Sequence, residues 1–155
     1  MIIDLQSVPH QTSTNYPAPF RAAVAGRSRQ RVGNAAGLTR FGVNLTTLAP
    51  GSCSALRHWH SQQDEFVYIV TGELTLVTDA GEQLLTPGMM AAFPAGEANG
   101  HHLINRSDQP ATYLEVGDRT PNDQATYPDD DLLALPAPTG HRFTHRDGRP
   151  YSAPS

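Results

Sequence analysis

Two histidines one residue apart, followed closely by an acidic pair, are the feature of this sequence most suited to chemistry. His58 and His60 lie in the segment LRHWHSQQDEFVYIV, which runs from polar residues into an apolar, β-branched stretch. Because side chains alternate between the two faces of a strand, His58 and His60 share one face and Trp59 points to the other. Glu65 begins the next expected strand, and a tight connection would return its carboxylate to the two imidazoles.

This combination of nitrogen and oxygen donors is typical of a site for a divalent metal ion. Three such ligands suit a borderline ion such as Zn, Fe, Mn, Co or Ni. A fourth ligand is expected, and the segment GHHLIN offers His101 and His102 on opposite faces of one strand. Only one of these two can point toward the interior shared by His58 and His60, and alternation alone leaves the choice open.

The segments around these donors have the pattern of short strands separated by turns. Apolar residues alternate in TRFGVNL, EFVYIV is a short apolar run, and glycine or proline ends each segment. Turn sequences recur about every eight to twelve residues, which is typical of all-β sandwiches and barrels. Residues 38–117 contain no capped window with sustained helical periodicity. We therefore expect an all-β core over residues 38–117.

The spacing of the candidate ligands resembles the two motifs of the cupins, a superfamily of small β-barrel proteins. The first motif is matched by Gly51, His58, His60, Glu65 and Gly72. The second motif is matched by Gly88, Pro94, Gly96, His101 and Asn105. The resemblance implies a double-stranded β-helix (a cupin or jelly-roll barrel) and a metal ion held inside it by His58, His60, Glu65 and His101. On stretches such as GHHLINRS and HRDGRPY, the whole chain is similar to a group of small single-domain bacterial cupins.

Two departures from the cupin pattern bear on the fourth ligand. One extra residue precedes His58, and a β-bulge would absorb it. Two extra residues follow Gly96, and without that insertion Asn99 would occupy the histidine position of the second motif. We expect the insertion to extend the loop, which makes His101 the fourth ligand and His102 the alternative.

The two ends of the chain differ from this core in composition. Residues 1–37 are polar and irregular, and residues 118–155 are rich in proline and aspartate. Segments of this kind lack the apolar content to fold alone. Because both still carry scattered large apolar residues, we expect an N-terminal arm (1–37) and a C-terminal arm (118–155) that pack on the barrel (38–117) or on a partner subunit.

Charged side chains cluster in both arms. Arg27, Arg29 and Arg31 share one face if their segment is extended; they could bind an anionic ligand, but we favour a solvated face. The aspartate run 129–131 is expected to be solvated, or to cap a helix that begins in the following LLAL. Neither cluster is assigned to the metal site.

Length, charge and cysteine content limit the class of protein. A chain of 155 residues is most simply one domain, and its net charge of −4 argues against a nucleic-acid partner. The single cysteine, Cys53, fits a packed side chain in a reducing compartment rather than a disulfide. The sequence shows no signal peptide and no apolar stretch long enough for a membrane span. We expect a cytoplasmic protein that binds a small molecule.

An ion with four protein ligands keeps about two positions for a substrate, water or O₂. We expect a metal-dependent isomerase, dioxygenase or lyase that acts on a small oxygenated metabolite such as a sugar or sugar phosphate. The alternative is a non-catalytic module that binds or senses a small molecule or a metal. Tyr113 and Glu115 share a strand face and are candidates for a general base if that face is interior. We expect the cavity to be apolar and to be lined by Phe41, Val43, Val67, Ile69 and Leu103.

Assembly is predicted from the strand edges. Unpaired edges invite pairing with another chain, and extended arms can reach a partner. A homodimer is therefore the expected state.

Overall fold

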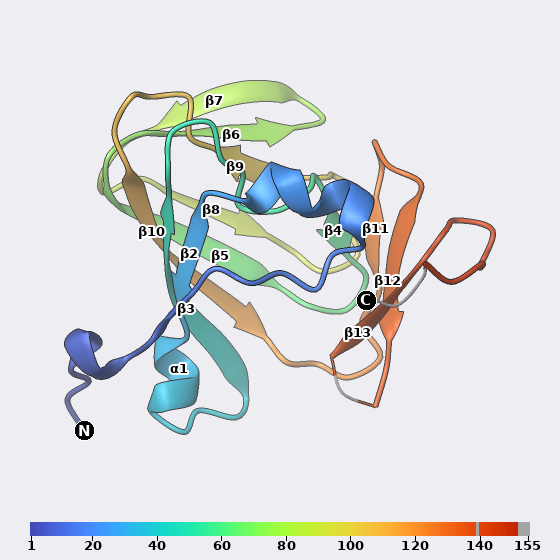
Figure 1. The fold of residues 1–155 in the computed structure, drawn as a ribbon, viewed down its shortest axis with the longest axis horizontal. Coiled ribbons are helices and arrows are strands. Elements are labelled where there is room, and N and C mark those ends of the chain that lie inside the picture. The colour runs from blue at the N-terminus through green and yellow to red at the C-terminus, as the bar shows by residue number, and fades with distance from the viewer. Residues whose placement is uncertain (139, 152–155) are drawn as a thin grey trace.

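The computed structural model describes residues 1–138 and 140–151, and most of them lie in or between β-strands (Figure 1). Helical structure among these residues is limited to the 3₁₀ helices η1 (Leu5–Ser7) and η2 (Ala18–Val24) and the single turn α1 (Val32–Ala35). None of these helices is long and apolar enough to cross a membrane. The strands are β1 (His10–Gln11), β2 (Arg27–Gln30), β3 (Phe41–Leu48), β4 (Trp59–His60), β5 (Glu65–Thr71), β6 (Leu74–Thr78), β7 (Gly81–Leu85), β8 (Met90–Phe93), β9 (His102–Ile104), β10 (Ala111–Asp118), β11 (Ala125–Tyr127), β12 (Leu132–Pro136) and β13 (His141–Thr144).

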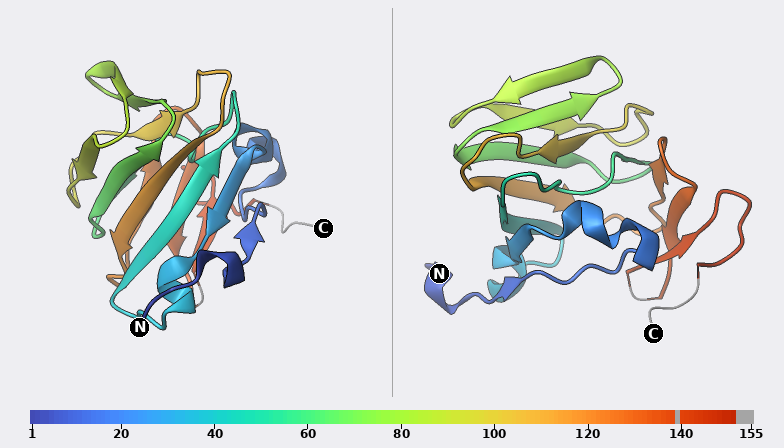
Figure 2. Two further views of the ribbon diagram at one scale, coloured as in Figure 1. Left: turned by 90° about the vertical axis from the view of Figure 1, so that its left-hand side faces the viewer. Right: turned by 45° about the horizontal axis from the view of Figure 1, so that its top comes forward.

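Hydrogen bonds join these strands into three sheets. The largest has the order β1-β2-β3-β10-β5-β8, and the others are β7-β6-β9 and β13-β12-β11-β4. Strands far apart in sequence pair over their whole length: β3 and β10 are antiparallel from Leu48 opposite Ala111 to Phe41 opposite Asp118. Figure 2 shows β5, β10, β3 and β2 running side by side, with the smaller sheets on other sides of the fold. The expected all-β architecture is confirmed.

The terminal segments are more regular than expected from their composition. β2 pairs with β3 inside the six-stranded sheet, and β11, β12 and β13 form a sheet with β4. The segment LLAL lies in strand β12, so the alternative expectation of a capped helix there is wrong. Both arms are therefore built into the sheets, because their backbone groups pair with strands of the central region.

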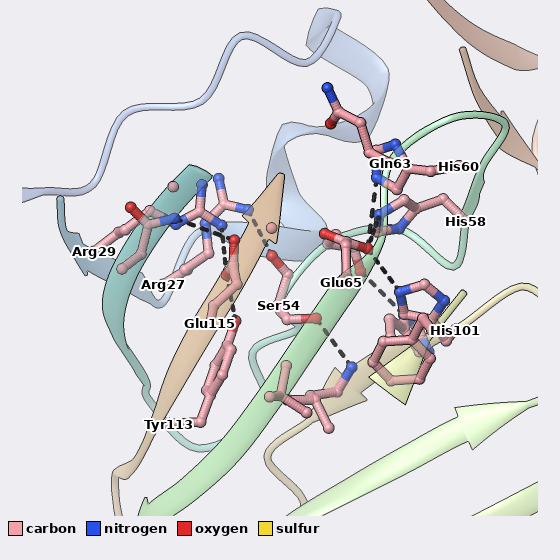
Figure 3. Close-up of a pocket in the computed structure, with 18 of the residues that line it drawn as sticks. Arg27, Arg29, Ser54, His58, His60, Gln63, Glu65, His101, Tyr113 and Glu115 are labelled. Carbon is pink, nitrogen blue, oxygen red and sulfur yellow. Dashed lines mark hydrogen bonds and ion pairs between the residues drawn. The ribbon is translucent and has the colours of Figure 1, made fainter. Parts of the chain in front are cut away.

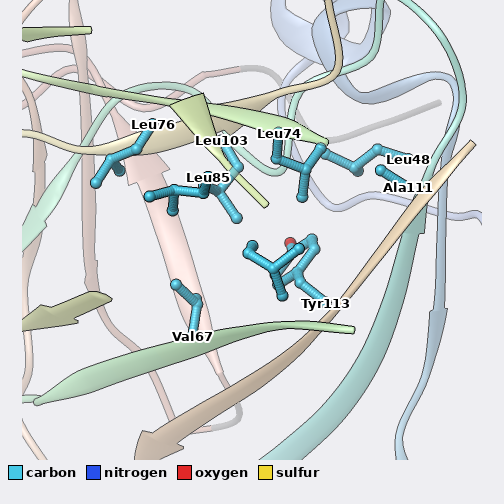
Figure 4. Packing of buried hydrophobic residues seen from close by; sticks show 9 residues of the cluster. Leu48, Val67, Leu74, Leu76, Leu85, Leu103, Ala111 and Tyr113 are labelled. Carbon is cyan, nitrogen blue, oxygen red and sulfur yellow. The ribbon is translucent and has the colours of Figure 1, made fainter. Parts of the chain in front are cut away.

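Two apolar clusters stabilise this arrangement. The first fills the space between the six-stranded and three-stranded sheets (Figure 4) and consists of Leu48, Val67, Ile69, Leu74, Leu76, Leu85, Leu103, Ala111 and Tyr113. The second is made mainly by the arms and consists of Tyr16, Val24, Ala125, Tyr127, Leu132 and Ala134. Each fully buried Leu or Ile side chain contributes about 1.5–3 kcal/mol. The arms thus supply their own share of the core.

The inward face of β3 is the opposite of the one predicted. Thr46 and Leu48 are fully buried, whereas Phe41 is 42% exposed. Val43 packs on the outer side of the sheet against α1. The approach is so close that a Cβ atom added to Gly33 of α1 would lie 2.8 Å from the backbone nitrogen of Val43. The predicted placement of Phe41 and Val43 in the cavity is wrong, because alternation defines the period of a strand but not which face is interior.

Gly72 allows the tight connection between β5 and β6. Its φ of 73° lies in the left-handed region that other residues rarely adopt. A Cβ at this position would also lie 2.8 Å from the carbonyl oxygen of Pro110, at the approach to β10. The glycine of the first motif is therefore needed for both backbone conformation and close packing.

Candidate metal centre

Backbone pairing brings the two histidine segments together. His60 lies in β4, Glu65 is the first residue of β5, and His101 directly precedes β9. His58 and His101 form an antiparallel bridge, with the amide of His101 donating to the carbonyl of His58 at 2.8 Å and the reverse bond at 3.2 Å. Two pieces of chain about forty residues apart therefore present their side chains to the same point.

All four predicted ligands meet around the carboxylate of Glu65 (Figure 3). Its Oε2 atom lies 3.6 Å from Nε2 of His58, 3.5 Å from Nε2 of His60 and 2.9 Å from Nε2 of His101. The donor atoms of His58, His60 and Glu65 all lie within 4.8 Å of one another. The spacing of the sequence motif thus corresponds to one compact group of side chains.

The imidazoles of His58 and His60 each make a hydrogen bond on the side away from Glu65. These bonds determine which ring nitrogen is protonated and which presents its lone pair to Glu65. Nδ1 of His58 lies 2.8 Å from the carbonyl oxygen of Leu56, and Nδ1 of His60 lies 2.6 Å from Oδ2 of Asp123. A carbonyl and an ionised carboxylate only accept hydrogen bonds, so each Nδ1 carries the proton and donates it. In the neutral imidazole, Nε2 then presents a lone pair to Glu65.

This orientation fits a cation. Two imidazole lone pairs and a carboxylate oxygen are all acceptors, and they repel one another unless a positive charge lies among them. Imidazole nitrogen and carboxylate oxygen are the donors that Zn, Fe, Mn and Ni accept in proteins. The residues present therefore fit a divalent metal ion at this point.

Charge and burial agree with a ligand role for Glu65 and His101. Burial acts to raise the pKa of Glu65, but its contacts with His101 and His58 outweigh this and hold the pKa well below its usual range. Burial lowers the pKa of His101, a residue that is 6% exposed and whose ring stacks on Phe93 with centroids 3.5 Å apart. An anionic carboxylate and a neutral imidazole are the forms in which these groups bind metals.

The alternatives for the fourth ligand lie elsewhere. Oδ1 of Asn99 accepts a hydrogen bond from the amide of Asp79 at 3.0 Å, and Nδ1 of His102 bonds the carbonyl oxygen of Ala55 at 3.0 Å. The inserted Gly100 passes close to other chain segments, since a Cβ there would lie 2.8 Å from Cγ of Pro128. The structure thus places His101, and neither of its alternatives, beside Glu65.

Asp123 is a site residue that the sequence did not indicate. It is 2% exposed, and besides His60 it accepts the amide of Gln62 at 2.9 Å through Oδ1. Burial acts to raise its pKa, but the neighbouring His141 imidazole at 3.8 Å and the hydrogen bond from His60 hold the pKa well below the usual range of an aspartate. A lone aspartate in the polar stretch TPNDQ has no motif spacing that could have identified it, because its partners come from other strands.

A cavity of about 480 Å³ adjoins the imidazoles, and its lining is more polar than expected. Val67 and Leu103 do line it, but so do Arg27, Arg29 and Glu115. Arg27 is only 8% exposed, and Arg29 pairs with Glu115 at 3.3 Å. The preference for a solvated face at these two arginines was wrong, and so was the expectation of an apolar cavity.

The Glu115 carboxylate is held in place by neighbours from three strands. Besides Arg29, it accepts a hydrogen bond from Nδ2 of Asn44 at 3.2 Å and from the hydroxyl of Tyr113 at 3.5 Å. Burial raises the pKa of Tyr113, so its hydroxyl stays protonated and can donate. Tyr113 and Glu115 thus lie on the interior face of β10, which was the condition for considering them as general bases.

Comparison with known proteins agrees with this geometry. Residues 44–117 match the family model described as a cupin domain. A crystal structure of a sugar phosphate isomerase from a cupin superfamily, from Silicibacter pomeroyi DSS-3, is 48% identical, with a TM-score of 0.94 over 99% of this chain and 98% of that one. The chain therefore belongs to the cupin superfamily, as the two motifs implied.

More distant structures share the fold. A protein from Acidithiobacillus ferrooxidans is 23% identical, with a TM-score of 0.80 over 94% of this chain and 92% of that chain. The polyketide cyclase RemF from Streptomyces resistomycificus is 19% identical, with a TM-score of 0.63 over 76% and 78% of the two chains. No curated protein sequence matches the chain.

Proposed function

We propose that this protein is a metal-dependent enzyme that isomerises a small sugar phosphate. The observation that carries the proposal is the convergence of two imidazole lone pairs on the Glu65 carboxylate at the wall of a cavity. The 48% identical relative from Silicibacter pomeroyi is named a sugar phosphate isomerase, which supports this choice among the reactions open to a cupin metal site. Fold alone does not decide the reaction.

In this proposal His58, His60, Glu65 and His101 hold one divalent ion, which when bound supplies Lewis-acid polarisation of a substrate carbonyl. Asp123 and the Leu56 carbonyl hold the protons of His60 and His58 on Nδ1, away from the ion. Such outer contacts orient the imidazoles and raise their basicity. The ligand set is thus fixed before substrate enters.

Glu115 is the group to which we assign proton transfer. Exchange of a carbonyl and a neighbouring hydroxyl moves one proton between the adjacent carbons and one between their oxygens, and it needs no oxidant or reductant. The Glu115 carboxylate would take the proton from the hydroxyl-bearing carbon and return it to the former carbonyl carbon. Arg29 and Asn44 fix its two oxygens, so the carboxylate faces the cavity in a defined orientation.

The test is a metal-resolved exchange assay. The protein is stripped with a chelator, reloaded separately with Mn, Zn, Fe(II) or Ni, and incubated in D₂O with pentose and hexose phosphates. The proposal expects interconversion of aldose and ketose phosphates, with deuterium entering the carbon next to the carbonyl, for at least one metal. The His58→Ala/His60→Ala double variant should lose both metal and turnover. Tight metal binding without exchange on any substrate would instead identify a binding module.

The proposal also includes the architecture and assembly expected from the sequence. We propose that the three sheets form the double-stranded β-helix of the superfamily, with residues 38–117 as its barrel. We further propose that two copies pair as a homodimer in the cytoplasm. Large apolar side chains on the outward face of β5 support the pairing, since Phe66, Tyr68 and Val70 are 36%, 36% and 40% exposed.

A further inference from the structure

The lining of the cavity includes a buried positive charge, that of Arg27. Arg27 is 8% exposed, and its guanidinium donates through Nη1 to the carbonyl oxygen of Ser54 at 2.6 Å. No carboxylate of the described residues 1–138 and 140–151 lies within 4.0 Å of it. Removing a charge from water without a partner of opposite sign is unfavourable. Such a group points to a missing anion.

Arg29 stands beside Arg27 and is incompletely satisfied as well. The two residues are separated by one position in β2, so their side chains share the face that lines the cavity. Arg29 uses Nη2 for the ion pair with Glu115, and its buried Nε has no hydrogen-bond partner in the described part of the chain. Each guanidinium has five N–H donors, so most of the donors of this pair have no partner among the described residues.

The charges of this group do not cancel. Arg27 and Arg29 contribute two positive charges, and Glu115 contributes one negative charge next to them. Figure 3 shows this group and the three imidazoles as separate clusters within one pocket, with Ser54 and Glu65 between them. A ligand that spans the cavity could therefore place one end at the imidazoles and an anionic end at the arginines.

We propose that Arg27 and Arg29 form the subsite that binds the phosphate group of the substrate; this identifies the substrate's charged end and rests on the proposed function. The planar guanidinium fork matches the oxygens of a phosphate, and such charge-assisted bonds are strong in a buried site. Arg31 and Arg119 are more exposed and line the same cavity. They extend the positive charge toward solvent and favour the entry of an anion.

The experiment measures binding of inorganic phosphate to the full, metal-loaded chain by calorimetry, without turnover. Arg27→Met keeps the aliphatic length but removes the charge, and it should weaken phosphate binding by about tenfold or more. Arg27→Lys should bind phosphate more weakly than the wild type and more tightly than Arg27→Met. The matched control is Arg106→Gln, which removes an arginine with a 53% exposed side chain, paired with Glu82 away from the cavity. It should bind phosphate as the wild type does.

Three results would overturn the subsite. The first is a folded Arg27→Met or Arg27→Lys protein that binds phosphate as tightly as the wild type. The second is loss of phosphate binding in His58→Ala/His60→Ala. The third is a wild-type protein that binds malonate more tightly than phosphate. The second would place phosphate on the metal, and the third would assign the arginines to a carboxylate. Circular dichroism verifies that each variant is folded, and metal content verifies that the two Arg27 variants are loaded. Because no turnover is measured, a failed isomerase assay leaves this result unaffected, and the two proposals can fail separately.

Discussion

Replacement of Asp123 by Asn tests the geometry of the metal centre most directly. The Asp123 carboxylate has two acceptor oxygens, one for Nδ1–H of His60 at 2.6 Å and one for the amide of Gln62 at 2.9 Å. Asparagine has the same shape but only one acceptor. Its amide nitrogen must therefore face either His60 or the Gln62 amide, and both are donors in the wild-type protein.

Either orientation weakens the site. If the asparagine nitrogen faces His60, the imidazole can accept that bond only by moving its proton to Nε2, where it blocks the bond to the metal. If it faces Gln62, two buried donors meet and the site is strained. Loss of an outer hydrogen bond of this kind typically reduces metal affinity by about 10- to 100-fold, or roughly 1.4–2.8 kcal/mol. We expect a loss of that size in Asp123→Asn.

The measurement is competition between the protein and a chelator of known affinity, at a temperature where the variant is fully folded. Asp131→Asn is a matched control, because Asp131 also bonds a histidine Nδ1 (His145, 2.7 Å) and a backbone amide (Arg146, 2.8 Å), outside the cavity. Asp131→Asn should bind metal as the wild type does. If folded Asp123→Asn did so too, Asp123 would not control the proton position on His60, and the lone-pair reasoning would fail.

Three further predictions concern catalysis, acid stability and assembly. Glu115→Gln should retain its metal but lower kcat by about 10²- to 10⁴-fold, and unchanged turnover would remove Glu115 from proton transfer. Arg57 bonds Asp129 through two nitrogens at 2.7 Å and, chiefly by that bond, lowers the pKa of Asp129. The ion pair therefore stabilises the fold above the ordinary aspartate pKa of about 4, and its contribution of roughly 1 kcal/mol or less is lost as pH falls below that value. Thermal melts should show wild type above Asp129→Asn at pH 7 and no difference near pH 2, whereas a gap that persists in acid contradicts this. Phe66→Glu should convert a dimer to a monomer in analytical ultracentrifugation, and a wild-type mass of one 16.7 kDa chain would refute the dimer itself.

The four side chains of the candidate metal centre could be predicted because their information is local. Alternation in a strand places His58 and His60 on one face, and the motif spacing adds Glu65 and His101. Asp123 could not be predicted in this way. Its contact with His60 depends on how the segment after β10 folds back to pair β11 with β4, and no pattern in the sequence records that path.

The sequence failed to predict both which face of β3 is interior and that Arg27 is buried, and the reason is the same in both cases. Hydrophobic patterning assumes that the interior face of a strand is apolar, so Phe41 and Val43 were placed inside and the arginines of β2 outside. In the structure the inward residues of these strands include Asn44 and Arg27, because part of the interior is a polar cavity rather than core. Sequence reasoning from burial fails where a fold encloses a binding site.

That failure also bears on what the arms do. Arg27 and Arg29 belong to the N-terminal segment, and Tyr127 and His141 belong to the C-terminal one, so both arms line the cavity of the central strands. A segment that only covered a barrel would gain nothing by burying a guanidinium that no carboxylate of the described residues neutralises. Burial of a guanidinium without a carboxylate partner is unfavourable, and an anion bound beside Arg27 would offset that cost. Phosphate binding is therefore expected to offset the free-energy cost of burying Arg27. We predict that phosphate raises the melting temperature of the wild type more than that of Arg27→Met.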